Sequence, residues 1–282
     1  MKNFPPFPLL RLTEKCLVKA VLLILLFSIP GFVSALDYYW VNGSGNWSDF
    51  ANHWAKVCNP SGPGDFHLNV PTAGDDVFFT GSGTAPCPTG QPAYTVFVDA
   101  STTVPKCRNM NWMDAPNGTI LDGSATGRLD IYGSLVLNGN MSITFPGEIH
   151  FITFGAASTI TSNGVSFPST GYVHFEGTTG GWMLNDAFTA NGWVFHNGGI
   201  LMSNNQTITV GWRFEGNSPG RLELGDSDFI LNGEHAQFYY APADFLAGTS
   251  HIIVNSNGSV RGTNTFPDIS QFHDVTFNVS TI

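Results

Sequence analysis

Short runs of alternating apolar and polar residues dominate the chain after Thr119. They are rich in Val, Ile, Phe and Thr and are bounded by Gly, Asn or Asp, as in "EIHFITFG", "GYVHFEG", "GWVFHNGG" and "GRLELGDSDFILNG". A period of two predicts strands with one buried face, and the bounding residues predict tight turns between them. No segment beyond residue 35 shows a sustained apolar period of 3.6 with helix caps, so we expect an all-β fold.

The segment from Asp37 to about Pro116 is richer in loops than the rest. Turn signals such as Asn59-Pro60 and Ser61-Gly62-Pro63-Gly64 surround short apolar runs. The clearest strands predicted here are "DDVFF" (Asp75 to Phe79) and "YTVFVDA" (Tyr94 to Ala100).

The spacing of the runs favours a right-handed parallel β-helix, or β-solenoid, with a β-sandwich as the alternative. In a solenoid, successive coils stack strand on strand and leave a weak repeat of about 20 to 50 residues. His150, His174 and His196 recur at such a spacing, each beside a phenylalanine, although the order of the two residues reverses at His196. Asn-Gly pairs at the turns suit the corners of a coil and equally the turns of a hairpin.

The first 35 residues have the pattern of a secretory signal peptide. An apolar run, Ala20 to Phe27, follows four basic residues and precedes a small-residue cleavage pattern, Val33-Ser34-Ala35. The run is too short for a membrane anchor and ends near Pro30 and Gly31. We therefore expect cleavage after Ala35, secretion to the cell surface or medium, and no membrane insertion of the mature chain.

Charge and cysteine content narrow the function classes further. Acidic residues outnumber basic ones 21 to 11, which argues against nucleic acid as a partner. Beyond the predicted signal the cysteines are Cys58, Cys87 and Cys107, so three disulfide pairings are open. Cys87 and Cys107 flank the predicted strand at Tyr94 to Ala100, and we expect this pair to form the disulfide with Cys58 free.

Three tryptophans, Trp40, Trp47 and Trp54, lie at intervals of seven within "YYWVNGSGNWSDFANHWA". Exposed indoles could stack on a sugar, which makes these residues carbohydrate-binding candidates. Alternatively, the rings cover the open end of the first coil, because a solenoid needs a cap that shields its core and its edge strand. We favour the cap.

Catalytic and metal chemistry have little support in the sequence. Polysaccharide cleavage needs convergent carboxylates, and the candidates are the pairs Asp75 with Asp76 and Asp226 with Asp228. Stacked histidines could bind a transition metal, but the reversal at His196 sends that residue to the opposite face of its strand. No Cys/His pattern has zinc spacing, so we expect no enzymatic activity, no cofactor and no metal site.

The opening motif, together with "VPTAGDDVFF" (Val70 to Phe79) and "CRNMNW" (Cys107 to Trp112), resembles the start of very large exported surface proteins of Bacteroidota. These adhesin-like proteins are often delivered by the type 9 secretion system, and the motif is also similar to the start of autotransporter passengers. The later "NNQTITVG" and "AGTSHIIV" resemble their β-solenoid repeats. The resemblance implies a capping segment over 36–116, a solenoid over 117–282 and surface display.

From these observations we expect a non-enzymatic, adhesin-like protein or structural stalk, with a carbohydrate-binding or polysaccharide-cleaving β-helix as the alternative. The partner would be an unidentified surface ligand, either a glycan or the surface of a host or neighbouring cell. The repeats run to Ile282, so we also expect a truncated solenoid whose last strand self-associates.

Overall fold

The computed structural model describes residues 35–81, 87, 89–101, 103–155, 157–217, 219–233, 237–240, 244–255, 259–261 and 273–278. The chain divides into two units, Met1–Ser34 and Ala35–Ile282, and the second is described here. The predicted signal peptide therefore lies outside the described residues, apart from Ala35. The described part contains no helix that is long and apolar enough to cross a membrane.

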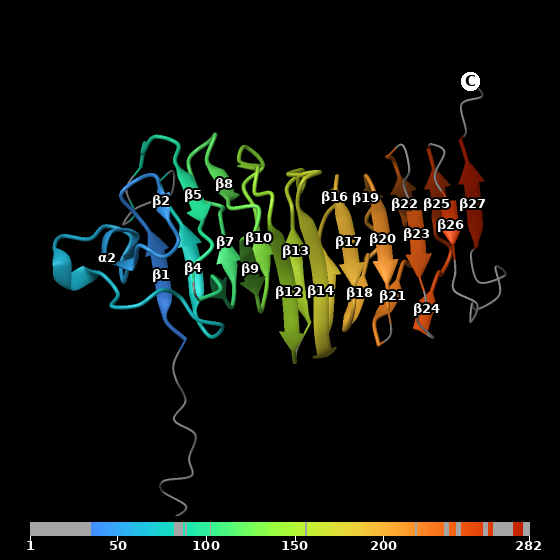
Figure 1. The fold of residues 1–282 in the computed structure, drawn as a ribbon, viewed down its shortest axis with the longest axis horizontal. Helices are drawn as coiled ribbons and strands as arrows, with labels where there is room; N and C mark the ends of the chain where they lie inside the picture. The colour runs from blue at the N-terminus through green and yellow to red at the C-terminus, as the bar shows by residue number, and fades with distance from the viewer. Residues whose placement is uncertain are drawn as a thin grey trace, which may run out of the picture. The chain divides into compact units, whose positions relative to one another are not determined.

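The second unit is a parallel β-solenoid, so the predicted fold class is confirmed (Figure 1). Its strands form four sheets, and among the named strands every pairing is parallel except that of β1 with β3. The ten-stranded sheet contains β1 (Asp37–Trp40), β3 (Trp54–Ala55), β4 (Asp76–Phe79), β7 (Met110–Asn111), β10 (Leu135–Val136), β13 (Ser158–Thr161), β15 (Gly181–Leu184), β18 (Ile200–Met202), β21 (Arg221–Glu223) and β24 (Asp244–Leu246).

Three further sheets complete the coils. The eight-stranded sheet contains β6 (Lys106–Cys107), β9 (Arg128–Ile131), β12 (Glu148–Phe154), β14 (Tyr172–Thr179), β17 (Trp193–His196), β20 (Arg213–Gly216), β23 (Gln237–Tyr240) and β26 (Ser259–Arg261). The four-stranded sheet contains β2 (Gly45–Asn46), β5 (Thr95–Val98), β8 (Ile120–Gly123) and β11 (Ser142–Ile143). The five-stranded sheet contains β16 (Phe188–Ala190), β19 (Ile208–Val210), β22 (Asp228–Leu231), β25 (His251–Val254) and β27 (Asp274–Phe277).

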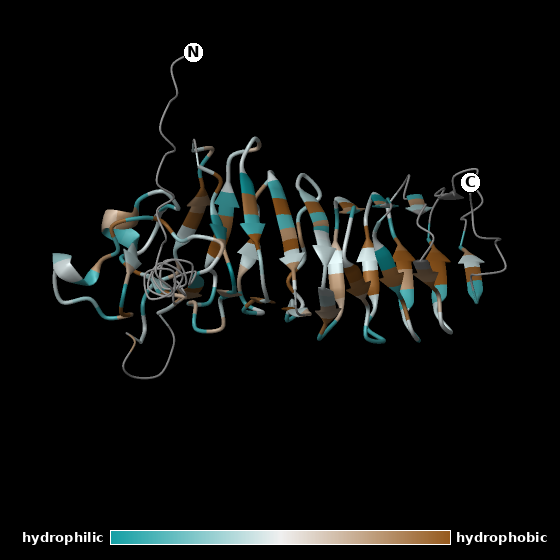
Figure 2. Cartoon of the chain, turned by 90° about the horizontal axis from the view of Figure 1, so that it is seen from below, coloured by the Kyte–Doolittle hydropathy of each residue, from teal (hydrophilic) through white to brown (hydrophobic). Residues whose placement is uncertain are grey.

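The alternation along the predicted strands buries one face of each sheet in a continuous core. Apolar and polar positions alternate along the strands in Figure 2, and β17 shows the corresponding pattern of half-buried and buried residues. Identical core residues stack in successive coils: Phe151 lies over Phe175 with ring centroids 5.2 Å apart, and Phe214 over Phe238 at 5.6 Å. Burial of each such ring stabilises the fold by about 1.5–3 kcal/mol.

A ladder of glycines precedes the strands of the eight-stranded sheet, at Gly127, Gly147, Gly171 and Gly192. These residues allow the backbones of adjacent coils to approach closely. A Cβ atom on Gly147 would lie 2.3 Å from the carbonyl oxygen of Gly127, and one on Gly192 would lie 2.3 Å from that of Gly171. Only glycine fits at such contacts between backbones.

The tryptophan-rich segment packs at the N-terminal end of the ten-stranded sheet. Within it, β3 pairs antiparallel with β1 and is the terminal strand of that sheet. Trp40, Trp47 and Trp54 are at most 1% exposed, and Trp54 contacts each of the other two edge to face. The helices described are the short α2 (Phe50–His53) and the 3-10 helix η1 (Pro63–Asp65). The rings therefore belong to the core and cover the first coil.

The solenoid begins earlier than the expected boundary at residue 117. The parallel stack already includes β1 with β4 and β4 with β7, all within 36–116. That segment thus forms both the cap and the first coils. Its sequence shows no repeat because its strands are short and separated by long loops. The segment expected to form an associating edge is 272–282. Its residues 273–278 contain β27, the terminal strand of the five-stranded sheet, whereas 272 and 279–282 lie outside the described part.

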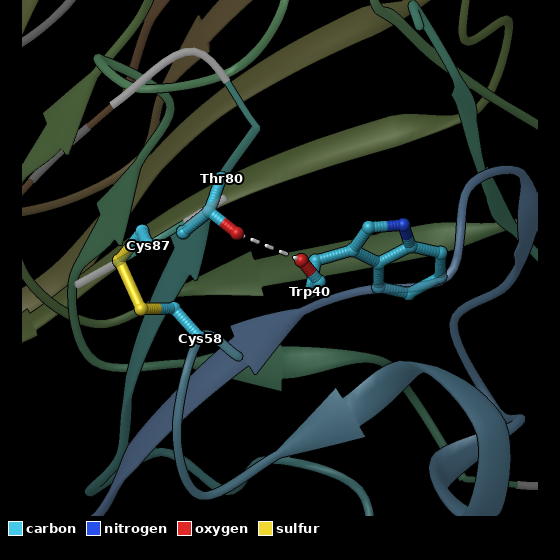
Figure 3. The surroundings of a disulfide bond; sticks show 4 residues. All are labelled: Trp40, Cys58, Thr80 and Cys87. Atoms are coloured by element: carbon cyan, nitrogen blue, oxygen red, sulfur yellow. Dashed lines mark hydrogen bonds between the residues drawn. A yellow bond between two sulfur atoms is a disulfide. The ribbon is translucent and has the colours of Figure 1, made fainter. Parts of the chain in front are cut away.

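The expected Cys87–Cys107 disulfide is wrong. Cys58 is bonded to Cys87, with Cα atoms 5.1 Å apart (Figure 3). Cys107 is free and fully buried, because its position in β6, opposite Ile131 in β9, directs the side chain into the core. Burial raises the pKa of the Cys107 thiol well above its ordinary value. Beside the bridge, the Thr80 hydroxyl donates a hydrogen bond to the Trp40 carbonyl oxygen over 3.2 Å.

Candidate functional site

The outer face of the eight-stranded sheet carries charged, imidazole and aromatic side chains. Strand alternation sets this face: in β12, Ile149 and Phe151 are core residues, so Glu148 and His150 occupy the other face. The parallel register then aligns these positions in successive coils. Glu148 is opposite Tyr172, and His150 is opposite His174.

Two histidines and two glutamates from β12 and β14 form a histidine–glutamate cluster, defined as Glu148, His150, His174 and Glu176. The two imidazole rings stack with centroids 4.2 Å apart and planes 1° from parallel. His150 Nε2 lies 2.9 Å from Glu148 Oε2, and its Nδ1 lies 3.2 Å from Glu176 Oε2. His174 Nδ1 lies 3.8 Å from Glu176 Oε1. Both Nδ1 atoms thus face the same carboxylate.

Burial and hydrogen bonding shift the pKa values of His174 and Glu148 in this cluster. His150 is 3% exposed. Desolvation, and then the neighbouring His150, lower the pKa of His174 to about 4. The hydrogen bond with His150 is the main cause that lowers the pKa of Glu148. At neutral pH the cluster therefore presents an uncharged His174 imidazole beside an ionised Glu148 carboxylate.

An ion pair borders the cluster on β9. Arg128 Nε lies 2.6 Å from Asp130 Oδ1, and the register sets Arg128 opposite Glu148 and Asp130 opposite His150. The guanidinium is therefore directed to Asp130 in its own strand. The Glu148 and Glu176 carboxylates therefore contact His150 and His174.

A second group, the aromatic row, is defined as Tyr172, Trp193 and Trp212. Tyr172 and Trp193 occupy opposed positions in β14 and β17, with ring centroids 6.1 Å apart. Trp212 lies directly before β20 and stacks on Trp193 at 6.3 Å and 24°. Tyr172 is 40% and Trp212 50% exposed. The row is thus an accessible aromatic surface that crosses three successive coils.

Charged groups flank the aromatic row. The Arg213 guanidinium carbon lies 5.5 Å from the Trp193 ring centroid and 5.2 Å from that of Tyr239, which are cation–π contacts. Its Nη2 also lies 2.8 Å from Glu215 Oε2. The outer face therefore offers hydrogen-bond donors and acceptors next to the rings.

The structure places the predicted carbohydrate-binding tryptophans away from solvent. Trp40, Trp47 and Trp54 are buried, so no sugar ring can stack on their faces. Trp40 Nε1 donates to the Gly43 carbonyl oxygen over 2.8 Å, and Trp54 Nε1 donates to that of Trp47 over 2.8 Å. These contacts fit the capping interpretation, which the sequence analysis favoured.

The first candidate carboxylate pair has structural partners. Asp75 accepts hydrogen bonds from the backbone amides of Leu36 and Thr72. Asp76 lies against the Arg108 guanidinium, with Nε 2.8 Å from Oδ1. Burial by itself raises the pKa of Asp76, but the hydrogen bonds and charge of Arg108, with Asn109, outweigh it and lower the pKa. Neither side chain is free to act on a substrate.

The second pair is exposed, and each of its members contacts a residue of the neighbouring coil. Asp226 accepts a hydrogen bond from the Thr249 hydroxyl over 3.2 Å. Asp228 Oδ1 lies 3.7 Å from His251 Nδ1 on the neighbouring strand β25. The pair thus connects adjacent coils of the solenoid.

The predicted reversal at His196 is confirmed. His196 is fully buried, and Phe195 takes the outward position opposite His174. The sequence analysis missed the aromatic row, although a signal for it exists. Each of its members directly follows a glycine, in Gly171-Tyr172, Gly192-Trp193 and Gly211-Trp212.

Comparisons with known protein families, with curated proteins and with solved structures find no match to this chain. The geometry of the outer face is therefore the basis for the functional argument.

Proposed function

We propose that the chain is a non-catalytic, adhesin-like segment of an exported surface protein, and that the aromatic row binds carbohydrate. The observation that carries this proposal is the coil-crossing arrangement of Tyr172, Trp193 and Trp212, in which Tyr172 and Trp212 are exposed and Trp193 is half-buried. The apolar face of a pyranose ring stacks on an aromatic ring, and adjacent rings can hold successive units of a glycan. The ion pair of Arg213 and Glu215 lies beside the row and supplies charged groups that would bind the hydroxyl groups of such a glycan.

Two further observations support binding without catalysis on an exported protein. The Asp75 and Asp76 carboxylates are occupied by structural partners, whereas glycoside cleavage needs two carboxyl groups that act together on one bond. The Cys58–Cys87 disulfide is of the kind that persists in oxidising compartments such as the cell exterior. Export itself is tested by N-terminal sequencing of secreted material, which we expect to begin at Leu36.

Glycan-array binding tests the proposed function. We expect Trp212→Ala and Trp193→Ala to weaken binding at least about fivefold, the effect of losing a contact worth about 1 kcal/mol. Leu68→Ala is the matched control, because Leu68 is 82% exposed and far from the eight-stranded sheet in sequence. Equal binding by all variants, or no glycan bound by the native chain, would refute the role of the row. Release of reducing ends from a bound glycan would refute the non-catalytic assignment.

A further inference from the structure

We propose that Glu148, His150 and His174 form a binding site for a divalent transition metal ion of the zinc type. One ligand atom from each of these residues lies within 4.8 Å of the other two. The residues come from β12 and β14, so the site joins two adjacent coils. Its residues differ from those of the aromatic row, which begins beside it because Glu148 lies opposite Tyr172, and metal binding does not depend on carbohydrate binding.

The ligand chemistry selects the class of ion. Imidazole nitrogen suits zinc, copper, iron and nickel, whereas calcium and magnesium prefer sites made wholly of oxygen. A set of two histidines and one carboxylate is typical of zinc, which takes ligands at about 2.0–2.2 Å. Ligand atoms of one tetrahedral zinc ion lie about 3.4 Å apart. Closing the site therefore requires the Glu148 and His174 side chains to turn toward His150, with the His174 ring remaining between His150 and Phe195.

Buried nitrogen atoms without hydrogen-bond partners are the second observation. Nδ1 of His150 and both ring nitrogens of His174 are shielded from solvent and make no hydrogen bond. The His150 side chain is more than nine-tenths buried, and leaving such a polar atom unpaired is costly. A metal ion bound through Nε2 of both rings would give the His174 Nε2 atom a partner, and each Nδ1 would then carry a proton directed at Glu176.

Glu176 completes the arrangement as a positioning residue. Metal-bound histidines usually direct their other ring nitrogen to a carboxylate, which fixes the ring and strengthens the ligand. The Nδ1 atoms of His150 and His174 lie 3.2 and 3.8 Å from the two Glu176 oxygens. This contact leaves Nε2 of His150 directed at Glu148 Oε2, 2.9 Å away, and a metal ion bound between these two atoms would replace the proton that they share.

The test is zinc titration of the full chain in competition with a chromophoric chelator, with Co²⁺ absorption as a second readout. We expect one ion per chain and visible bands from tetrahedral or five-coordinate Co²⁺. Glu148→Gln and His174→Asn should each weaken zinc binding by on the order of tenfold or more. Glu148 is partly exposed, so its variant keeps the fold, and circular dichroism without metal verifies this for both.

His251→Gln is the matched control, because His251 also lies between two carboxylates, Asp228 and Asp274, on another sheet. We expect that variant to bind zinc as the native chain does. The proposal is overturned if the native chain binds no stoichiometric ion, or if Glu148→Gln and His174→Asn bind within twofold of it. A loss confined to His251→Gln would also overturn it, since the ion would then lie on the five-stranded sheet.

Discussion

The rings of Trp40 and Trp54 meet edge to face with centroids 4.9 Å apart, although their strands run in opposite directions. This contact joins the antiparallel β3 to the first parallel strand. Phe79 and Trp112 continue the aromatic stack into the next coils, with centroids 3.5 Å apart. The N-terminal tryptophans therefore act as part of the core.

Trp54→Ala should lower the free energy of unfolding by about 3–5 kcal/mol, because it leaves a large cavity among buried rings. Trp212→Ala, at a half-exposed indole, should change it by less than about 1 kcal/mol. Urea denaturation followed by circular dichroism measures both. Similar losses in the two variants would contradict the assignment of Trp54 to the cap.

Gly192→Ala should destabilise the solenoid by about 1–3 kcal/mol, because the added Cβ would lie 2.3 Å from the Gly171 carbonyl oxygen. Gly64→Ala is the control, since no atom lies within 4 Å of the Cβ position there and that change should be close to neutral. Thermal unfolding of the two variants decides the matter. A neutral Gly192→Ala would show that adjacent coils can separate at this corner.

Joint replacement of Cys58 and Cys87 by serine should lower the free energy of unfolding by about 3–4 kcal/mol, from the entropy of a loop spanning 29 residues. A reducing agent should bring the native chain to the same stability and leave the variant unchanged. Non-reducing peptide mapping should recover Cys58 linked to Cys87. Alkylation of Cys107 in the folded chain would contradict its burial.

The stability of the chain should fall in acid partly because of His196. Burial lowers the pKa of His196 from 6.5 to about 4. Below pH 6.5 the unfolded chain therefore binds a proton that the folded chain does not, and stability falls as the pH drops from about 6.5 to 4. The full effect is about 3 kcal/mol and is absent above pH 7.

His196→Gln should reduce this loss of stability, because the amide keeps a hydrogen-bond donor near the Gly199 carbonyl oxygen and does not titrate. Urea midpoints of the native chain and the variant at pH 7 and pH 4 measure the difference. Every other titrating group is present in both proteins, so equal pH dependence would show that His196 is protonated in the folded state.

Strand alternation made much of the fold predictable. The run at Asp75 to Phe79 is β4 (Asp76–Phe79), and the reversal at His196 correctly places that residue inside. The sequence also favoured the buried cap over exposed indoles for the tryptophans. The first two conclusions need only the parity of residues along one strand, and the third needs only the fact that the end of a solenoid must be covered.

The parts that failed depend on contacts between coils. Cys58 and Cys87 meet because β3, β1 and β4 pair side by side, which loop length alone does not reveal. Likewise, His150 and His174 lie opposite each other on adjacent coils. Their register becomes definite only when β12 is paired with β14. Strand parity excludes His196 as a metal ligand, but parity alone does not show that His150 and His174 meet.

The glycine ladder holds the backbones of four successive coils in close contact at one corner, so we expect changes in the length of these coils elsewhere on their perimeter. The segment 56–75, between β3 and β4, is one such excursion, and it leaves the pairing of β1 with β4 intact. Insertions at those other corners would not move Tyr172 relative to Trp193, or His150 relative to His174. The length of the coils can thus vary at some corners of the solenoid, while the residues of the aromatic row and the histidine–glutamate cluster keep their register.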